Sequence, residues 1–165
     1  MNIKRAFKTI NKLGNKRNYY QRLEVESNKV LVSNGHLIVT VSDADFEASK
    51  QYLDNLEEND RLARVALDLN DTVQVKLTTV SILCGDTLAR VIKADNALGV
   101  VNEEYLKVLQ DVGCSMYMVM QKSTSEMIKT PMVECVVANN KVYHCNAVLP
   151  IHCNVRDVLE NVLNN

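Results

Sequence analysis

This chain of 165 residues has little of what several protein classes depend on. It contains no tryptophan, and aromatic residues make up only 5%, which argues against a surface that stacks the bases of single-stranded nucleic acid. Only two prolines occur, and 47% of the residues are apolar against 24% charged, so we expect a folded chain rather than a disordered one. No apolar run approaches the roughly 20 residues that cross a bilayer. The basic opening is too interrupted for a signal peptide, so we expect neither feature.

The short motifs of common enzymes are absent as well. The sequence contains no GxxxxGK[ST], GxGxxG, HExxH or GxSxG, so the signals for a phosphate loop, a dinucleotide site, a zinc protease and a hydrolase all fail. We therefore expect a protein that is not an enzyme and that needs no cofactor. The five cysteines include no CxxC pair. Without a secretion signal, they are interpreted as reduced thiols of a cytoplasmic protein.

One group of residues has the side chains that zinc prefers. It consists of Cys135, His144, Cys145, His152 and Cys153. Neighbouring residues of a strand point to opposite faces, so one site could hardly use both members of a His-Cys pair. A cysteine in an apolar strand also behaves as a small buried hydrophobe. We therefore expect no metal site, and a metal analysis of the purified protein tests this.

The charges, by contrast, are strongly segregated. The first 22 residues contain seven basic side chains and no acidic one, which leaves 12 Lys and Arg against 20 Asp and Glu in the remainder. Concentrated positive charge is typical of a surface that faces a polyanion. At helical spacing Lys4, Lys8 and Lys12 form one stripe, with Arg5 beside it. The opposite face is apolar and consists of Ile3, Phe7, Ile10 and Leu13. A solvated helix face is the competing interpretation.

The first half of the chain predicts one helix and then a meander of short strands. The helix covers 2–14 and ends at Gly14, a frequent helix-terminating residue. Alternation around Leu23 and Val25 predicts the first strand. The next two are KVLVS and HLIVTV, joined by Asn34-Gly35, a dipeptide that suits a type I′ turn. An acidic helical excursion over 43–60 follows, with an inward face of Phe46, Tyr52, Leu53 and Leu56. Further strands are expected over 63–69, 72–84 and 87–94.

The second half repeats this order. A helix over 101–112 has Asn102 as its N-cap and acidic residues in its first turn. Its buried face is expected to contain Tyr105, Leu106, Leu109 and Val112. Strands over 115–122, 130–138 and 141–151 follow. The pattern predicts an α+β fold in a single domain, 1–153, with halves of about 1–95 and 96–153, and a C-terminal helical extension, 154–165.

Three stretches together resemble a known family. IKRAFKTINKLGNKRNYYQRLEVESNKVLVS contains a basic helix and two strands joined by a tight turn. GVVNEEYLKVLQDV has an extended strand that leads into an N-x-x-Y-L-x-x-L helix. TPMVECVVANNKVYHCNAVLPI is similar to a closing hairpin that ends in a Met-Pro-Met-like tripeptide, here Leu149-Pro150-Ile151. In this order they resemble one domain of a DNA sliding clamp, the ring-shaped processivity factor of replication.

The resemblance implies a function. Clamp helices face a DNA channel, so the basic residues would contact the phosphate backbone of duplex DNA without reading its bases. These residues are Lys4, Arg5, Lys8, Lys12, Lys16 and Arg17. Leu149, Pro150 and Ile151 would lie near the pocket in which clamp partners such as a polymerase dock. Clamp rings close with six domains, so a chain with one domain would form a homo-oligomer of six copies. We expect a cytoplasmic processivity factor, of phage origin in one version of this hypothesis.

Some features depart from the clamp pattern. The helix over 101–112 offers only Lys107 against Glu103, Glu104 and Asp111, although channel helices are basic. The acidic excursion and the terminal helix have no counterpart in the family. The alternative is therefore a protein-interaction module, an adaptor or an inhibitor of a replication component, that uses the clamp fold without encircling DNA.

Overall fold

The structure, a computed structural model, describes residues 1–14, 16–24, 28–63, 72–74, 76–94, 97–112, 116–121, 132–138 and 146–148. The fold is α+β, as the sequence predicts. Its helices are α1 (Ile3–Leu13), α2 (Asp43–Ser49) and α4 (Glu103–Asp111), and a short 3-10 helix, η1 (Lys50–Tyr52), continues α2. Within these described ranges no helix is long and apolar enough to cross a membrane.

All strands of the described residues belong to one sheet. They are β1 (Asn18–Arg22), β2 (Lys29–Ser33), β3 (Leu37–Ser42), β4 (Leu56–Glu58), β5 (Thr72–Gln74), β6 (Lys76–Cys84), β7 (Thr87–Ala94), β8 (Ala97–Asn102), β9 (Met116–Gln121), β10 (Met132–Ala138) and β11 (Asn146–Val148). The order along the sheet is β4-β1-β2-β3-β11-β10-β8-β7-β6, and β9 pairs with both β10 and β5.

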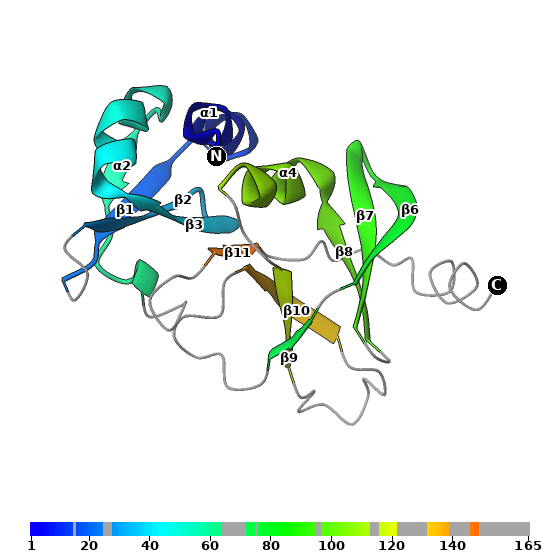
Figure 1. The fold of residues 1–165 in the computed structure, drawn as a ribbon. Coiled ribbons are helices and arrows are strands. Elements are labelled where there is room, and N and C mark those ends of the chain that lie inside the picture. The colour runs from blue at the N-terminus through cyan, green and yellow to red at the C-terminus, as the bar shows by residue number, and fades with distance from the viewer. Residues whose placement is uncertain are drawn as a thin grey trace.

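The same local order occurs twice along the chain. The α1 helix precedes the antiparallel strands β1, β2 and β3, and α4 precedes the antiparallel strands β9, β10 and β11. The two meanders join edge to edge because β11 pairs antiparallel with β3. Figure 1 shows α1 and α4 on the same side of this sheet, and α1 packs against α4. The two helices therefore share one face of the sheet.

The main core lies between the helices and this face. The largest side chain that α1 contributes is Phe7, fully buried and in edge-to-face contact with Phe46 of α2, with the ring centroids 6.5 Å apart. Such pairs contribute beyond the area that they bury. The β2 strand alternates: Val30 and Val32 join the helix side, whereas Leu31 packs in a second cluster with Ile38 and Leu62. Because both of its faces are covered, the centre of β2, residues 30–32, is apolar at three consecutive positions.

One polar side chain links the two halves inside this core. The buried Asn34, in the turn between β2 and β3, donates from Nδ2 to the carbonyl of Ile10 at 3.1 Å and to the hydroxyl of Tyr105 at 3.2 Å. Its Oδ1 accepts from the backbone of His36 and Leu37. Burial raises the pKa of Tyr105. All groups of a buried amide must find partners, so Asn34 fixes the end of α1 relative to α4.

Several expected boundaries need correction. The first strand is Asn18–Arg22 and not the stretch around Leu23, because these residues pair with β2 on one side and with β4 on the other. The Asn34-Gly35 turn between β2 and β3 is not of type I′. That type needs a positive φ at both residues, and of the two only Gly35 has one, +89°. Only the first part of the acidic excursion is helical; Leu56–Glu58 is a strand, parallel to β1.

Other expectations are confirmed. Gly14 follows the last residue of α1, although its φ of −79° is not left-handed. Close contact explains the glycine instead, because a Cβ there would lie 3.0 Å from the Cβ of Asn34. Asn102 caps α4, and its expected face is buried. The inward face predicted for the excursion is confirmed in part, since Phe46 and Leu53 are buried and Tyr52 and Leu56 are partly buried against the main core. Most of the 63–69 strand and the terminal helix lie outside the described residues.

Candidate nucleic-acid interface

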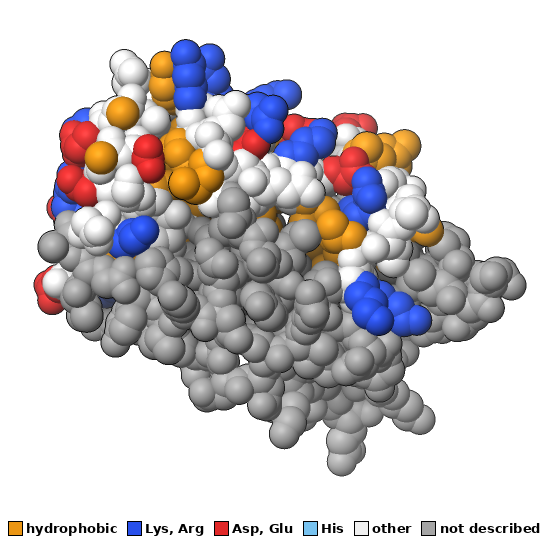
Figure 2. All heavy atoms as spheres, viewed as in Figure 1, with side chains coloured by type: hydrophobic (Ala, Val, Ile, Leu, Met, Phe, Trp, Pro, Cys, Tyr) orange, Lys and Arg blue, Asp and Glu red, His pale blue; other side chains and the backbone are white. Residues whose placement is uncertain are grey.

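The candidate interface is the outer face of α1. Asn2 caps the helix by accepting from the backbone N–H of Arg5 at 3.2 Å. Ala6, Phe7 and Ile10 face the core and are fully buried, so the residues on the opposite side must face solvent. Lys4, Lys8 and Lys12 are exposed. Figure 2 shows Lys and Arg side chains gathered along the rim where α1 lies in Figure 1, with acidic side chains beside them.

Two of the three stripe lysines meet one aromatic ring. The ammonium groups of Lys4 and Lys8 each lie 5.2 Å from the ring centroid of Tyr52. Tyr52 is half-buried and packs against the main core. Both distances fall within the range of cation–π attraction. The acidic excursion therefore contacts the basic helix directly through an aromatic side chain.

Arg5 has a different environment from the stripe lysines. Its guanidinium forms an ion pair with Asp111 of α4, with Nε 2.7 Å from Oδ2 and a second bond from the other nitrogen. The Asp111 side chain is only 6% exposed. This bond and the carboxylate charge raise the pKa of Arg5. The bidentate geometry makes Arg5 a bridge between the two helices, and its charge is offset by Asp111.

The last two predicted residues, Lys16 and Arg17, are exposed in the connection between α1 and β1. Lys16 has a φ of +67°, which is uncommon for a residue with a side chain. The side chain of Asn55 donates to the Lys16 carbonyl at 2.8 Å, and the carbonyl of Asn55 accepts from the N–H of Asn18 at 3.3 Å. The segment after η1 thus fixes the backbone next to these cations.

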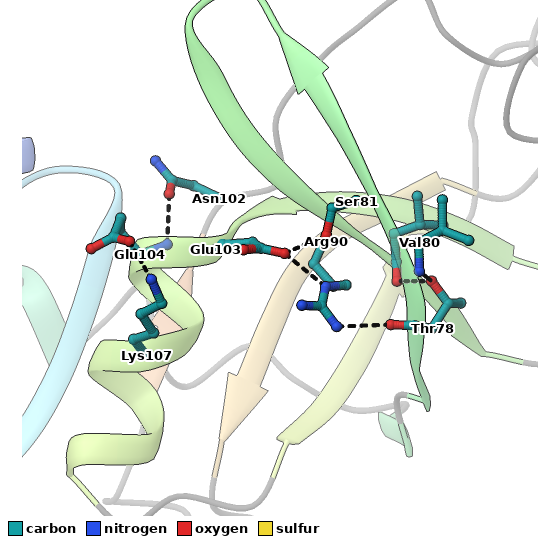
Figure 3. Close-up of polar contacts among 9 residues, drawn as sticks. Thr78, Val80, Ser81, Arg90, Asn102, Glu103, Glu104 and Lys107 are labelled. Carbon is teal, nitrogen blue, oxygen red and sulfur yellow. Dashed lines mark hydrogen bonds and ion pairs between the residues drawn. The ribbon is translucent and has the colours of Figure 1, made fainter.

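The acidic residues of α4 are paired. Glu104 accepts from Lys107 at 2.6 Å, and this contact raises the pKa of Lys107. Glu103 is 14% exposed and turns toward β6 and β7, where it accepts from the hydroxyl of Ser81 and, at 2.8 Å, from Nε of Arg90 (Figure 3). These two bonds, that of Ser81 first, lower the pKa of Glu103.

Arg90 lies near Glu103 because β7 pairs with β8 in a regular register that sets Ala89 opposite Asn102, the residue before Glu103. The register between β6 and β7 shifts between Leu77 and Ser81. A second nitrogen of Arg90 donates to the carbonyl of Thr78 at 3.1 Å, as Figure 3 shows, and the hydroxyl of Thr78 donates to the Val91 carbonyl at 2.8 Å. Bulges often re-aim a side chain. Here the irregular segment of β6 contains Thr78, whose carbonyl accepts from Arg90 of the neighbouring strand.

Other predicted residues are not placed by the structure. Leu149, Pro150 and Ile151 lie outside the described residues, as do His144, Cys145, His152 and Cys153. Cys135 belongs to β10. Within the described part of the chain no group of three His, Cys, Asp or Glu side chains is arranged to hold a metal ion.

No protein-family model, curated protein or solved structure matches this chain. The interface is therefore interpreted from its own geometry. Sequence reasoning missed the role of Tyr52 beside the lysines and the pairing of Arg5 with Asp111. The sequence assigned Tyr52 correctly to an inward face, but no local signal connects it to lysines more than 40 positions away.

Proposed function

We propose that this protein is a non-enzymatic, clamp-like protein that associates with duplex DNA through the outer face of α1. The observation that supports this most is the open charge of Lys4, Lys8 and Lys12. They are exposed, and among the residues that the structure describes the ion pairs of α1 involve Arg5 alone. Exposed lysines without carboxylate partners are available to phosphates, which is the usual basis of binding that does not depend on sequence.

The neighbouring helix no longer argues strongly against this proposal. Each of the three acidic residues of α4 has a cationic partner: Glu103 has Arg90, Glu104 has Lys107 and Asp111 has Arg5. Their repulsion of a phosphate is therefore reduced. The shared placement of α1 and α4 on one face of a mostly antiparallel sheet is similar to a clamp domain, in which two helices face DNA. Such a protein would act in replication as a processivity factor, assembled from six copies.

The direct test is duplex binding measured by fluorescence anisotropy over a salt series. We expect weak binding that is insensitive to base sequence and that falls steeply between about 50 and 200 mM salt. Reversing the charge of Lys4, Lys8 and Lys12 to Glu should abolish it. Full binding by that triple variant would exclude the interface.

A matched control separates position from net charge. The pair Lys8→Glu and Lys12→Glu changes the net charge by the same amount as Lys76→Glu and Lys93→Glu, two exposed lysines that face each other across β6 and β7. We expect the α1 pair to weaken binding much more than the β6–β7 pair. Equal losses would show that only total charge matters.

The mass in solution tests the clamp part of the proposal. A hexamer in light scattering supports a ring, whereas a monomer or dimer favours the adaptor or inhibitor module. Because the two measurements are independent, DNA binding by a monomer would retain the interface and reject the ring.

A further inference from the structure

Tyr52 occupies an unusual position between the acidic excursion and the basic helix. It is the last residue of η1, and its ring is anchored on the apolar side by contact with the main core. On the other side it meets Lys4 and Lys8, whose ammonium groups are both 5.2 Å from the ring centroid. The two lysines are one helical turn apart on α1, so they are neighbours on its surface. A single aromatic ring therefore makes cation–π contacts with two lysines.

This contact changes how the two lysines present their charge. Free lysine side chains have many rotamers, and ordering them on a ligand costs binding free energy. A ring that attracts the ammonium groups reduces that freedom before any ligand arrives. Both groups lie within 5.2 Å of one point, so they are at most 10.4 Å apart. Even this upper limit is close to the Debye length of about 10 Å at 0.1 M salt. A phosphate close to one ammonium group is therefore also attracted by the other.

Two like charges one turn apart on a helix normally repel each other. The negative face of the Tyr52 ring offsets part of this repulsion, and both lysines stay exposed. The contact thus keeps two cations together and accessible. Lys12, the third lysine of the stripe, provides an internal reference because the ring contacts of the described residues pair Tyr52 with Lys4 and Lys8 only.

We propose that Tyr52 is a positioning residue that holds Lys4 and Lys8 as a preformed pair for the backbone phosphates of duplex DNA. This inference rests on the proposed function and deepens it. It also gives the acidic excursion a task, since η1 brings to the basic helix the ring that organises it. The ring acts through the lysines, so its effect must disappear when the lysines are removed.

The test is a double-mutant cycle on DNA affinity. Tyr52→Leu keeps an apolar side chain against the core but removes the ring, and we expect it to weaken binding about fivefold, from the order of magnitude of ordering two lysine side chains. Tyr52→Phe keeps the ring and should bind within about twofold of the original protein. In a background with Lys4→Ala and Lys8→Ala, Tyr52→Leu should have no further effect.

The possible outcomes are distinct. Unchanged affinity of Tyr52→Leu overturns the inference, and so does the same loss in the background without the two lysines, which would show a merely structural role. Absence of DNA binding by the original protein would reject the proposed function itself, and the inference with it.

A second measurement does not require any variant to fold. In NMR spectra of the unmodified protein, the ring current of Tyr52 should shift the side-chain methylene signals nearest the ammonium groups of Lys4 and Lys8, but not those of Lys12. Identical shifts for all three lysines would overturn the inference.

Discussion

The two helices that share one face of the sheet, α1 and α4, differ in the sign and in the pairing of their charged side chains. The α1 helix presents Lys4, Lys8 and Lys12 to solvent and has cations, Lys4 and Arg5, in its first turn, where the helix dipole disfavours them. The α4 helix has Glu103 and Glu104 in its first turn, where the dipole favours them, and its acids are paired. The first-turn charges of α4 follow from helix stability, whereas Lys4 and Lys8 of α1 do not: Lys4 lies in the first turn, Lys8 lies in the middle of the helix, and neither has a carboxylate partner among the described residues. A role outside folding explains the latter better.

The largest loss of stability should come from substitutions on the buried faces of the two helices. Phe7 of α1 and Leu109 of α4 are fully buried in one cluster. Truncating either to alanine should lower the free energy of unfolding by about 3–5 kcal/mol for Phe7 and 2–5 kcal/mol for Leu109. Urea denaturation measures this. The exposed Lys8→Ala should remain within about 0.5 kcal/mol, and a loss as large as that of Phe7 would contradict the division of α1 into two faces.

The next effect concerns how the helices end. The α1 helix ends at Gly14, where an added Cβ would lie 3.0 Å from the Cβ of Asn34 and 3.3 Å from the Ile10 carbonyl. The α4 helix ends at Val112, which has a Cβ. Gly14→Ala should therefore cost about 1–3 kcal/mol of overpacking, seen as a lower urea midpoint with an unchanged m-value. Lys12→Ala in the same turn is the control. Wild-type stability of Gly14→Ala would mean that the helix end and the β2–β3 turn separate easily.

A smaller difference is expected at the helix starts. Asn102 accepts from the N–H of Glu104 at 2.8 Å, whereas the exposed Asn2 accepts from that of Arg5 at 3.2 Å. Replacing Asn102 by alanine should cost about 1 kcal/mol, and replacing Asn2 about 0.5 kcal/mol, because water can replace the longer, exposed bond. Thermal unfolding of both variants measures the difference. A larger loss for Asn2 would reverse the ranking of the two caps.

The smallest effect is a change in pH dependence. The pKa of Glu103 is lowered in the folded protein by Ser81 and Arg90, so its unfolded pKa, about 4.3, is the higher one. The contribution of Glu103 to the free energy of unfolding is fully present above the unfolded pKa and is lost as the pH falls through the folded pKa. Glu103→Gln should therefore flatten the acid side of the stability curve, and Ser81→Ala should do so in part. An unchanged acid slope in Glu103→Gln would show that the bonds around Glu103 are not kept in solution.

The comparison of the helices also shows what the sequence could predict. The apolar spacing of α1 and the Asn102 cap of α4 are local patterns, and the structure confirms both helices. The predicted position of the first strand, around Leu23, is wrong because the position of β1 depends on pairing with β4. That strand lies within a stretch rich in acidic helix formers, so the sequence does not reveal it. The sequence likewise predicts Arg5 as an unpaired cation, because local patterns do not show long-range pairing. Its partner Asp111 is 106 residues away in the chain, and only tertiary structure brings such residues together.

That separation has a consequence for how the protein is made. The α1 helix is translated before α4, and Asp111, the bidentate partner of Arg5, follows Arg5 by 106 residues. At about 5–20 residues per second, this interval is roughly 5–20 s. During it Phe7 and Ile10 have only the β2, β3 and α2 part of their final cover, next to a row of lysines. We therefore expect α1 to remain incompletely packed for seconds during synthesis, and we expect its positive charge to oppose association of that intermediate with other chains.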